Sequence, residues 1–402
     1  MHGGFRRPRR RCCPERLQYD TGHRPRSRVA FRRRVRRTLS QRGGQMPHSA
    51  IFRSSDPYEH QRSLRAEAVD LVVTAPGDFR GEATRIDVDR LWLQRGRESL
   101  PRIVHATVSK TRNGIFFLAD AQQAPTHHTG KEFPPGCMMV YSAGAEHHHR
   151  SSAACHWAAM SLDLEDLAAA GRAITGRDLT APKTSELIRP PVPLMDRLLR
   201  LHAAAGDLAA TAPDILAHPG VAKAIAQELI RVMVGCLTDG GAERINSRRQ
   251  RLPIMRRFER MLEANPGKPL YLAEICAAIG VPARTFRHYC WQHLGMSPHR
   301  YLWLRRMNLA RRALVSADPT ARTVAEVATA HGFWELGRFS VAFRKLFGES
   351  PSVTLRRSAD PKSLDDRAWA LVRPAALSWS DQAMEAPTFD KFSMPANWAQ
   401  SG

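Results

Sequence analysis

The fold of the C-terminal part of this 402-residue chain can be read from residues 323–351, "TVAEVATAHGFWELGRFSVAFRKLFGESP". Phe339, Phe343 and Phe347 recur every four residues, so their rings share one face of a helix and the basic residues lie on the other faces. Gly332 separates this helix from a shorter apolar one, because glycine readily adopts the left-handed backbone that ends a helix. The stretch therefore predicts two short helices joined by a tight turn.

The same pattern occurs earlier in the chain, in "LAEICAAIGVPARTFRHYCWQHLGMSP", residues 272–298. Gly280 takes the place of Gly332 and Phe286 takes the place of Phe339, with one additional residue in the second turn. A short helix, a left-handed glycine and a second helix with an inward stripe make a helix-turn-helix. Because the layout repeats at an offset of 52 to 53 residues, we expect two such motifs.

Further helical patterns surround the two motifs. Residues 254–265 form an amphipathic pattern that directs Met255, Phe258 and Leu262 inward. Residues 298–317 predict a longer helix, which would fix the separation of the two motifs. Helix-start signals occur at three places in this part of the chain. They are Ser297-Pro298, Thr323 with Glu326 as a capping box, and Ser350-Pro351.

Positive charge is distributed unevenly along the chain. The net charge is +13 for residues 1–45 and +11 for residues 251–357, but only +1 for residues 46–250 and −2 for residues 358–402. Positive charge concentrated on a helix-turn-helix repeat is the electrostatic signature of a DNA-binding domain.

The composition excludes several other classes of protein. The longest apolar runs are too short to cross a bilayer, so we expect no membrane partner. The seven cysteines are scattered without a CxxC pair, which favours reduced thiols in the cytoplasm over a disulfide framework.

The N-terminal half begins with short apolar or alternating segments between turn residues. The expected strands are 86–94, 103–109, 114–119, 137–144 and 155–162, a spacing typical of a small antiparallel barrel or sandwich. Helical patterns follow at 163–174, 193–209 and 221–237. In the last, Ala222, Ile225, Leu229 and Val232 form a stripe suited to packing against a subunit partner or the barrel. Residues 238–250 have the composition of a linker.

The two ends of the chain have different compositions. Residues 1–45 are Arg-rich and lack hydrophobic periodicity, so we expect disorder. They fit a nucleic-acid-binding arm, a targeting presequence, or a translation start placed too far upstream. The abrupt change in composition at Met46 favours Met46 as the true initiator. Residues 358–402 predict a mostly unstructured tail.

Residues 251–357 resemble the AraC/XylS family of bacterial transcription regulators. Three segments carry the resemblance: "IGVPARTFRHYCWQHLGMSPHRYL", "RRMNLARRAL" and "TVAEVATAHGFWELGRFSVAFRKLFGESP". The resemblance implies an α+β protein, in which a cupin-like β-barrel sensor and dimerisation domain with trailing helices spans residues 46–237. An all-α, seven-helix, double helix-turn-helix DNA-binding domain follows at 251–357.

The resemblance also implies a function and partners. We expect a regulator that binds double-stranded operator or promoter DNA, responds to an unknown small molecule, is not an enzyme, and contains no cofactor or metal. A homodimer, and contact with RNA polymerase if the protein is an activator, are further expectations. Neither the effector nor the direction of regulation is evident in the sequence.

In that family the exposed face of each second helix enters the major groove. The matching positions of this chain are Arg284, Arg287 and His288 in the first motif, and Leu336, Arg338 and Val341 in the second. Arg344 and Lys345 are expected to face the DNA or its backbone. Because arginine can form bidentate hydrogen bonds to guanine, whereas an aliphatic side chain only meets a thymine methyl group, the first helix should carry most of the base discrimination. The alternative is that these arginines contact only phosphates.

Three positions depart from the family pattern. Cys290 stands where an aromatic core residue is usual, Tyr271 where a polar cap is common, and Pro282 where a serine often caps the helix. Proline is tolerated in a first helical turn, so these changes affect the predicted start of the helix and not the fold.

The histidines of the N-terminal half raise an alternative function. "HHHR" at 147–150, with His127, His128 and Cys155-His156, offers ligands for Zn, Fe or Ni, which would make the chain a metal-dependent cupin enzyme with an appended DNA-binding module. Adjacent residues of a strand alternate between faces, so the three histidines cannot all reach one ion, and we expect exposed loop histidines. No nucleophile elbow, P-loop or dinucleotide fingerprint occurs. A ligand pocket lined by Trp92, Phe116, Met139 and Trp157 is the preferred interpretation.

Overall fold

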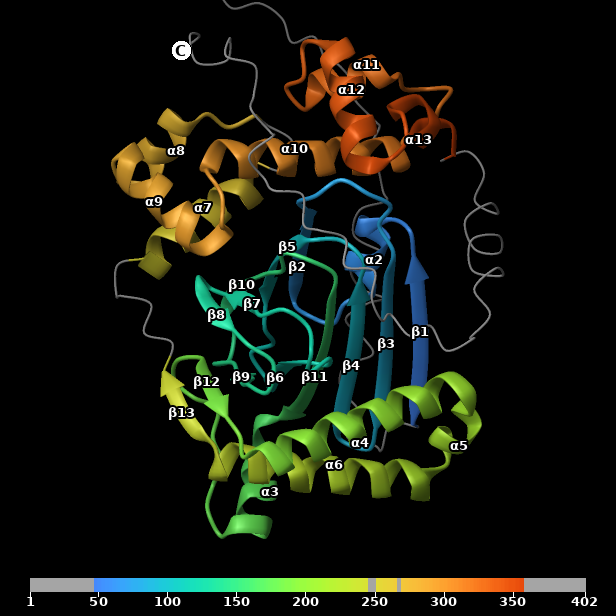
Figure 1. The fold of residues 1–402 in the computed structure, drawn as a ribbon, viewed down its shortest axis with the longest axis vertical. Helices are drawn as coiled ribbons and strands as arrows, with labels where there is room; N and C mark the ends of the chain where they lie inside the picture. The colour runs from blue at the N-terminus through green and yellow to red at the C-terminus, as the bar shows by residue number, and fades with distance from the viewer. Residues whose placement is uncertain (1–46, 245–250, 266–268, 358–402) are drawn as a thin grey trace, which may run out of the picture. The chain divides into compact units, whose positions relative to one another are not determined.

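The structure is a computed structural model that describes residues 47–244, 251–265 and 269–357 (Figure 1). These residues belong to one compact unit of the chain. The expectations for residues 1–45 and for the tail at 358–402 lie outside the described residues, as do residues 245–250 of the expected linker.

Short strands with alternating buried and exposed residues build two antiparallel sheets in the N-terminal half. The larger sheet has the order β1 (His48–Ser54), β3 (Gly81–Val88), β4 (Leu91–Glu98), β11 (Cys155–Asp163), β6 (Arg112–Leu118), β9 (Met138–Val140), β12 (Glu186–Arg189) and β13 (Gly241–Arg244). The smaller sheet has the order β2 (Ala68–Val73), β5 (Arg102–Thr107), β10 (Glu146–Arg150), β7 (Thr126–His128) and β8 (Lys131–Phe133).

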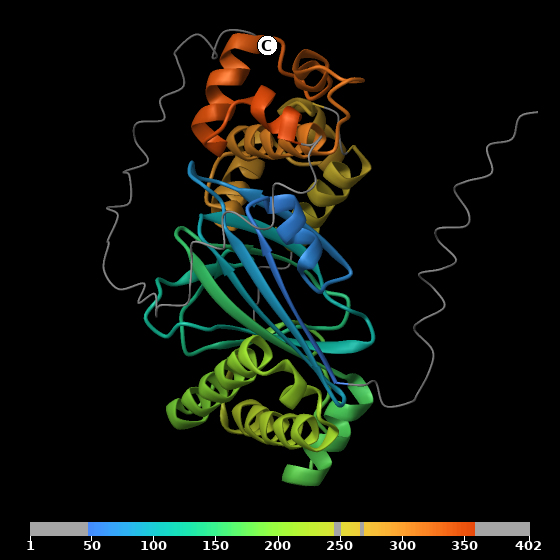
Figure 2. The ribbon, with the colours of Figure 1, turned by 90° about the vertical axis from the view of Figure 1, so that its right-hand side faces the viewer.

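The expected cupin-like barrel is not closed. Among the described residues, the larger sheet ends at β1 and β13 and the smaller one at β2 and β8, and no strand pairing joins the two sheets. The sheets therefore face each other as separate layers (Figure 2). An alternating pattern records which face of a strand is buried but not whether its edge has a partner, so sequence periodicity could not distinguish the two arrangements.

The single strand expected at 86–94 is wrong, because the chain reverses within it. Val88 and Leu91 are opposite each other in the ladder between β3 and β4, and Asp89 has a left-handed φ of 52° in the turn between them. Aspartate tolerates this conformation better than most residues. Apolar residues alternate on both sides of the turn, so the hairpin mimics one continuous strand in the sequence.

Three helices of the N-terminal half lie where the sequence predicts them. They are α3 (Leu164–Thr175), α4 (Val192–Thr211) and α6 (Pro219–Asp239), and two short helices, α2 (Pro57–Ser63) and α5 (Pro213–Ala217), were not expected. Helices α4 and α6 lie side by side (Figure 1) and share a hydrophobic core with β3, β4 and β11. Ala222, Leu229 and Val232 are buried in this core, and Ile225 packs against it. The apolar stripe of α6 thus covers the protein's own sheet.

The segment expected to be a linker is partly ordered into a strand. Helix α6 continues to Asp239, and β13 (Gly241–Arg244) pairs with β12. Gly-Gly and the charged residues after it have the composition of a loop, but the open backbone of β12 provides hydrogen-bond partners that composition does not reveal.

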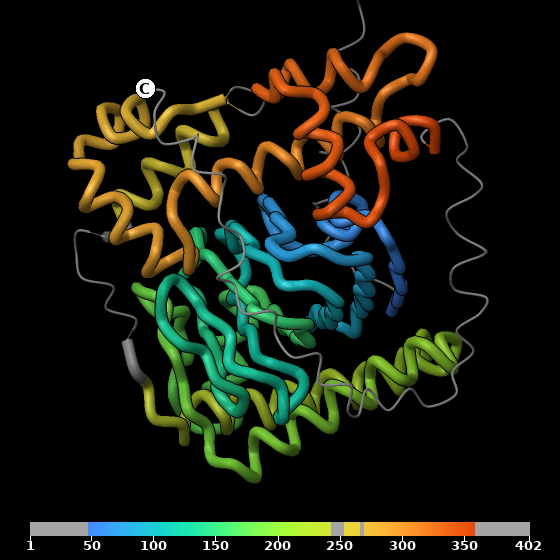
Figure 3. Tube along the Cα trace, turned by 45° about the horizontal axis from the view of Figure 1, so that its top comes forward, coloured from blue at the N-terminus to red at the C-terminus, as the bar shows by residue number. Residues whose placement is uncertain are grey.

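Seven helices make up the C-terminal half within the described residues. They are α7 (Arg251–Ala264), α8 (Leu272–Ile279), α9 (Ala283–Leu294), α10 (Pro298–Val315), α11 (Val324–Ala330), α12 (Leu336–Phe347) and α13 (Pro351–Arg357). The group α7–α9 lies at one end of α10 and the group α11–α13 at the other (Figure 3). None of the helices in the described ranges combines the length and the apolar composition that a bilayer-spanning helix needs.

The repeat predicted from the sequence is confirmed in the geometry of both turns. Gly280 and Gly332 both have left-handed backbones, with φ of 71° and 76°. Phe286 and Phe343 are fully buried, and Cys290 is buried where the family usually has an aromatic ring. The expected inward residues of α7, namely Met255, Phe258 and Leu262, are buried in the same core. The departures at the caps and core therefore leave the helix-turn-helix fold intact.

Candidate nucleic-acid interface

The second helix of the first motif, α9, has a basic exposed face. Pro282 precedes its first residue and supplies no side-chain cap, as expected for a residue without a side-chain acceptor. Arg284, Arg287 and His288 are all exposed, while Phe286 between them is buried. Intervals of three and four residues place the three polar side chains on one surface of the helix. The structure therefore brings together the residues predicted to read DNA in this motif.

The second helix of the second motif, α12, has a more apolar exposed face. Val341 is 70% exposed and Leu336 is 40% exposed, although aliphatic side chains usually avoid water. Arg338, Arg344 and Lys345 are exposed around them. All predicted contact residues of this motif thus lie on the surface, and the buried rings of Phe339 and Phe343 hold the helix from the opposite face.

Glu335 is a residue of this surface that the sequence reasoning missed. Its carboxylate accepts hydrogen bonds from Arg338, with 2.9 Å between Arg338 Nε and Glu335 Oε2 and 3.1 Å between Nη1 and Oε1. The interval of three residues could have indicated the pair, because i and i+3 side chains meet on a helix. Part of the positive charge of α12 is therefore neutralised within the protein.

Exposed tryptophans flank both basic faces, and the sequence reasoning also missed them. Trp291 is 60% exposed and lies four residues after Arg287 on α9, so both side chains share a surface. Trp334 is 72% exposed just before α12. Large rings left in water beside basic residues are typical of contact surfaces, where arginine and aromatic residues are enriched.

Helix α10 sets the relative position of the two motifs. It has 18 residues, which corresponds to a length of about 27 Å at ~1.5 Å per residue. Ser297 caps its start by accepting a hydrogen bond from the Arg300 amide at 3.3 Å. Tyr301, Leu304 and Leu314 are buried along it, so both motifs pack on one support. The predicted connecting helix and its cap are confirmed.

The same helix is attached to the N-terminal half through polar contacts. Arg311 forms a buried ion pair with Asp56, and Arg305 Nε lies 3.4 Å from Asp70 Oδ2. The side-chain amide of Asn308 donates to the Val73 carbonyl at 3.3 Å. Burial lowers the pKa of Arg311 to about 10, so its guanidinium remains charged at neutral pH. A change in the N-terminal half therefore has a direct route to the support of both motifs.

Three of the four residues predicted to line a ligand pocket meet in one cluster. Phe116, Met139 and Trp157 are buried together, and Trp157 Nε1 donates to Glu98 Oε1 at 2.7 Å. Trp92 lies elsewhere, with the guanidinium of Arg112 3.7 Å from its ring centroid. The sequence could place each side chain on a strand, but it could not show that β6, β9 and β11 are neighbours in one sheet.

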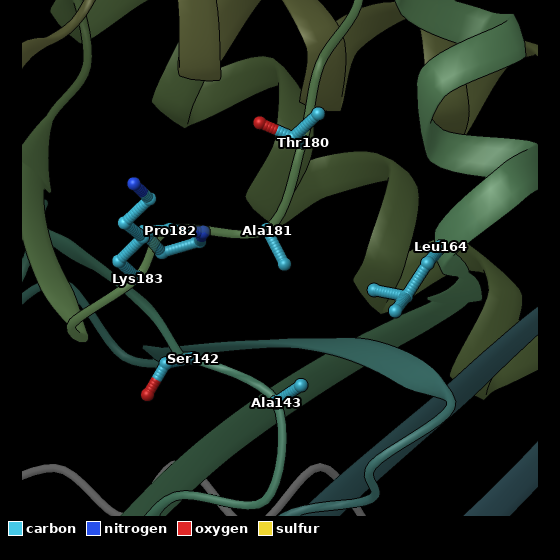
Figure 4. Close-up of a pocket in the computed structure, with 7 residues that line it drawn as sticks. All are labelled: Ser142, Ala143, Leu164, Thr180, Ala181, Pro182 and Lys183. Atoms are coloured by element: carbon cyan, nitrogen blue, oxygen red, sulfur yellow. The ribbon is translucent and has the colours of Figure 1, made fainter.

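A separate open cavity of about 450 Å³ lies beside the start of α3. Figure 4 shows Leu164 on one side and the segment around Ala181 on the other, with the loop between β9 and β10 below them. The residues that line it are Ser142, Ala143, Leu164, Thr180, Ala181, Pro182 and Lys183. None of the four predicted pocket residues is among them.

The histidines of "HHHR" are not exposed loop residues, which corrects the sequence-based expectation. They belong to β10, where His148 and His149 are buried. The expected alternation is confirmed: the His147 ring stacks on His128 with centroids 4.9 Å apart, whereas the His148 ring stacks on His105 at 4.8 Å. Three consecutive histidines resemble a polar loop in composition, and only pairing with β5 and β7 reveals the strand.

Comparison with known proteins places the C-terminal half in a family. Residues 275–357 match the family model described as a helix-turn-helix domain. A segment of 146 residues is 34% identical to the "Probable thc operon regulatory protein" of Rhodococcus erythropolis, covering 36% of this chain and 44% of that protein. A segment of 105 residues is 30% identical to the XylDLEGF operon transcriptional activator of Pseudomonas putida, covering 26% of this chain and 33% of that protein.

A solved structure is also similar in part. The transcriptional regulator with an AraC-type DNA-binding domain from Chromobacterium violaceum shares 27% identity at a TM-score of 0.25, covering 27% of this chain and 96% of that chain. The chain spans less than half the length of the two curated relatives above.

Two helix-turn-helix motifs carried on one helix, each with an exposed second helix, define a DNA-binding domain of the transcription-regulator class. More narrowly, the C-terminal half of this chain carries the helix-turn-helix domain of the AraC/XylS family. The resemblance seen in the sequence is thereby confirmed.

Proposed function

We propose that this chain is a sequence-specific DNA-binding transcription regulator. The observation that carries the proposal is the pair of exposed helix faces on α9 and α12, held at opposite ends of α10. With the motifs separated by a rigid support, both helices meet the same face of the duplex, about one helical turn or ~34 Å apart. Helix α9 presents Arg284, Arg287 and His288 to base edges. The more apolar face of α12 contributes affinity and position.

Selection of bound duplexes from a random DNA pool with the full chain tests this function. We expect enriched sequences with two conserved segments about one helical turn apart, and affinity that falls steeply with salt as counterions are released. Arg200→Ala, which removes an exposed arginine from α4, is the matched control and should leave both results unchanged. Recovery of random sequences by the folded protein would contradict the proposal.

The N-terminal half is proposed to bind a small-molecule effector. The buried aromatic cluster that contains Phe116, Met139 and Trp157 would supply the apolar surface for this ligand, and the ion pairs of α10 link this half to the DNA-binding motifs. Thermal-shift screening of the full chain tests it, since a ligand at ~100-fold above its Kd should stabilise the protein by about 2.7 kcal/mol. The matched variant Met139→Ala should weaken binding of any hit, whereas Ala181→Ser beside the open cavity should not.

Partners beyond DNA follow from the same proposal. A homodimer would place two pairs of motifs on adjacent operator segments, and an activator would contact RNA polymerase next to them. The alternative of a metal-dependent enzyme rested on the histidines of β10 together with His127, His128, Cys155 and His156. The alternation along β10 separates His148 from His147 and His149, so these three side chains do not meet at one ion.

A further inference from the structure

Three side chains of the kinds that bind metals meet where the two halves of the chain touch. His105 on β5 and His148 on β10 are directly opposite in the antiparallel ladder, so their side chains project from the same face. Glu259 on α7 approaches both, with His148 Nε2 2.7 Å from Glu259 Oε1 and His105 Nδ1 3.9 Å from Glu259 Oε2. One ligand atom from each residue lies within 4.8 Å of the others.

The distances between these ligand atoms are close to the distances between the ligand atoms of a bound zinc ion. Ligand atoms ~2.0–2.1 Å from a tetrahedral zinc ion are ~3.3 Å from one another, a value between the 2.7 Å and 3.9 Å that separate the two imidazoles from Glu259. Small rotations of the side chains would therefore bring the three donors to one point. Nitrogen and oxygen donors of this type suit zinc and similar transition metals better than calcium or magnesium.

Burial makes the arrangement more specific than a surface cluster. His105, His148 and Glu259 are 6%, 5% and 3% exposed, and they line a small cavity together with Thr129 and His293. The three donors are therefore enclosed by the protein and not spread over its surface. A buried carboxylate is costly unless it is paired.

A simple hydrogen bond between His148 and Glu259 is the alternative explanation. It would account for two of the three groups, but it gives no role to the His105 ring, which stacks on His148. His105 Nδ1 lies 3.9 Å from the buried Glu259 carboxylate and 4.0 Å from that of Glu263, which is more than half exposed. Two histidines and one glutamate with a remaining open position are a donor set found in zinc sites.

We propose that His105, His148 and Glu259 bind one divalent transition-metal ion of the zinc class. Two ligands come from the smaller sheet of the N-terminal half, and the third comes from the first helix of the DNA-binding half. The ion therefore joins the two halves and holds α7 against β5 and β10. This site is separate from the aromatic cluster proposed to bind the effector, and it does not depend on that proposal.

Zinc titration of the full, untagged chain after chelator treatment tests the site. Calorimetry gives the affinity and stoichiometry, and Co²⁺ absorption reports the coordination. We expect one ion per wild-type chain and at least tenfold weaker binding for each of His105→Gln, His148→Gln and Glu259→Gln. The control is His127→Gln on the neighbouring strand β7, which should bind as the wild type does.

Circular dichroism in the presence of chelator checks that each variant is folded. If Glu259→Gln does not fold, the two histidine variants decide the result, because they leave the carboxylate in place. Absence of zinc binding by the wild type, or equal binding by wild type and folded histidine variants, would overturn the proposal. Loss of binding in His127→Gln alone would place the ion elsewhere and would overturn it as well.

Discussion

Glu335 holds Arg338 in an ion pair at the N-terminal end of α12, with 2.9 Å between the carboxylate oxygen and Nε of the guanidinium. Both side chains are more than half exposed, so water and salt screen the pair and its contribution to stability is small. Its importance lies in DNA binding, because the same guanidinium is proposed to meet the duplex. DNA and Glu335 therefore compete for one cation.

Glu335→Ala should increase affinity for DNA. Removing the carboxylate frees Arg338 and reduces repulsion of phosphates, so we expect Kd to fall by about two- to fivefold at low salt, the range that an exposed pair can supply. Fluorescence anisotropy with an operator duplex measures it. Asp196→Ala on α4 changes the net charge equally at an exposed position of the N-terminal half and serves as the control. Equal effects of both variants would show a general charge effect.

Arg287→Ala should relax sequence preference at one base pair. If the exposed guanidinium on α9 reads a guanine edge, its loss costs roughly 1–3 kcal/mol at that position and little elsewhere. Competition assays with single-base operator variants provide the profile. A uniform loss on every sequence would identify a phosphate contact instead.

Arg338→Ala should weaken binding while most sequence preference remains. The face of α12 around it is apolar, with Leu336 and Val341 exposed, and such side chains discriminate bases weakly. We expect a lower affinity and a salt dependence that is smaller by about one counterion. Base-by-base scanning of the operator checks this. A preference profile dominated by the second half-site would refute the proposal that α9 discriminates bases while α12 contributes affinity and position.

His202 should make the N-terminal half sensitive to acid. Burial, followed by the charge of Arg95, lowers its pKa to about 3, below the ~6.5 of an exposed histidine. Above pH 6.5 neither the folded nor the unfolded state binds the additional proton. As the pH falls from 6.5 toward 3, the unfolded state binds it and the folded state does not, so stability is lost.

The loss attributable to His202 should reach at most about 2 kcal/mol at pH 5. Urea unfolding at pH 7 and pH 5 measures it, and His202→Gln should reduce the difference between the two values. The matched variant His218→Gln, at the exposed start of α6, should not. An unchanged difference in His202→Gln would mean that other buried groups cause the acid sensitivity.

Much of the C-terminal half could be predicted from the sequence, because its signals are local. The left-handed turns at Gly280 and Gly332 and the buried rings at intervals of four residues are set within single helices and turns. Helix periodicity also shows which side chains face outward, so Arg284, Arg287 and His288 could be assigned to one exposed surface. The pair of Glu335 and Arg338 was within reach of the same reasoning.

Tertiary structure alone decided how the N-terminal half is arranged. A turn at Asp89 divides what reads as one strand, and the two sheets remain open because edge pairing depends on strands far apart in the chain. The cluster of His105, His148 and Glu259 shows the same limit. Glu259 follows His148 by 111 residues, in a different half of the protein, so no periodicity connects them. Only the packing of α7 against β5 and β10 brings the carboxylate to the two imidazoles.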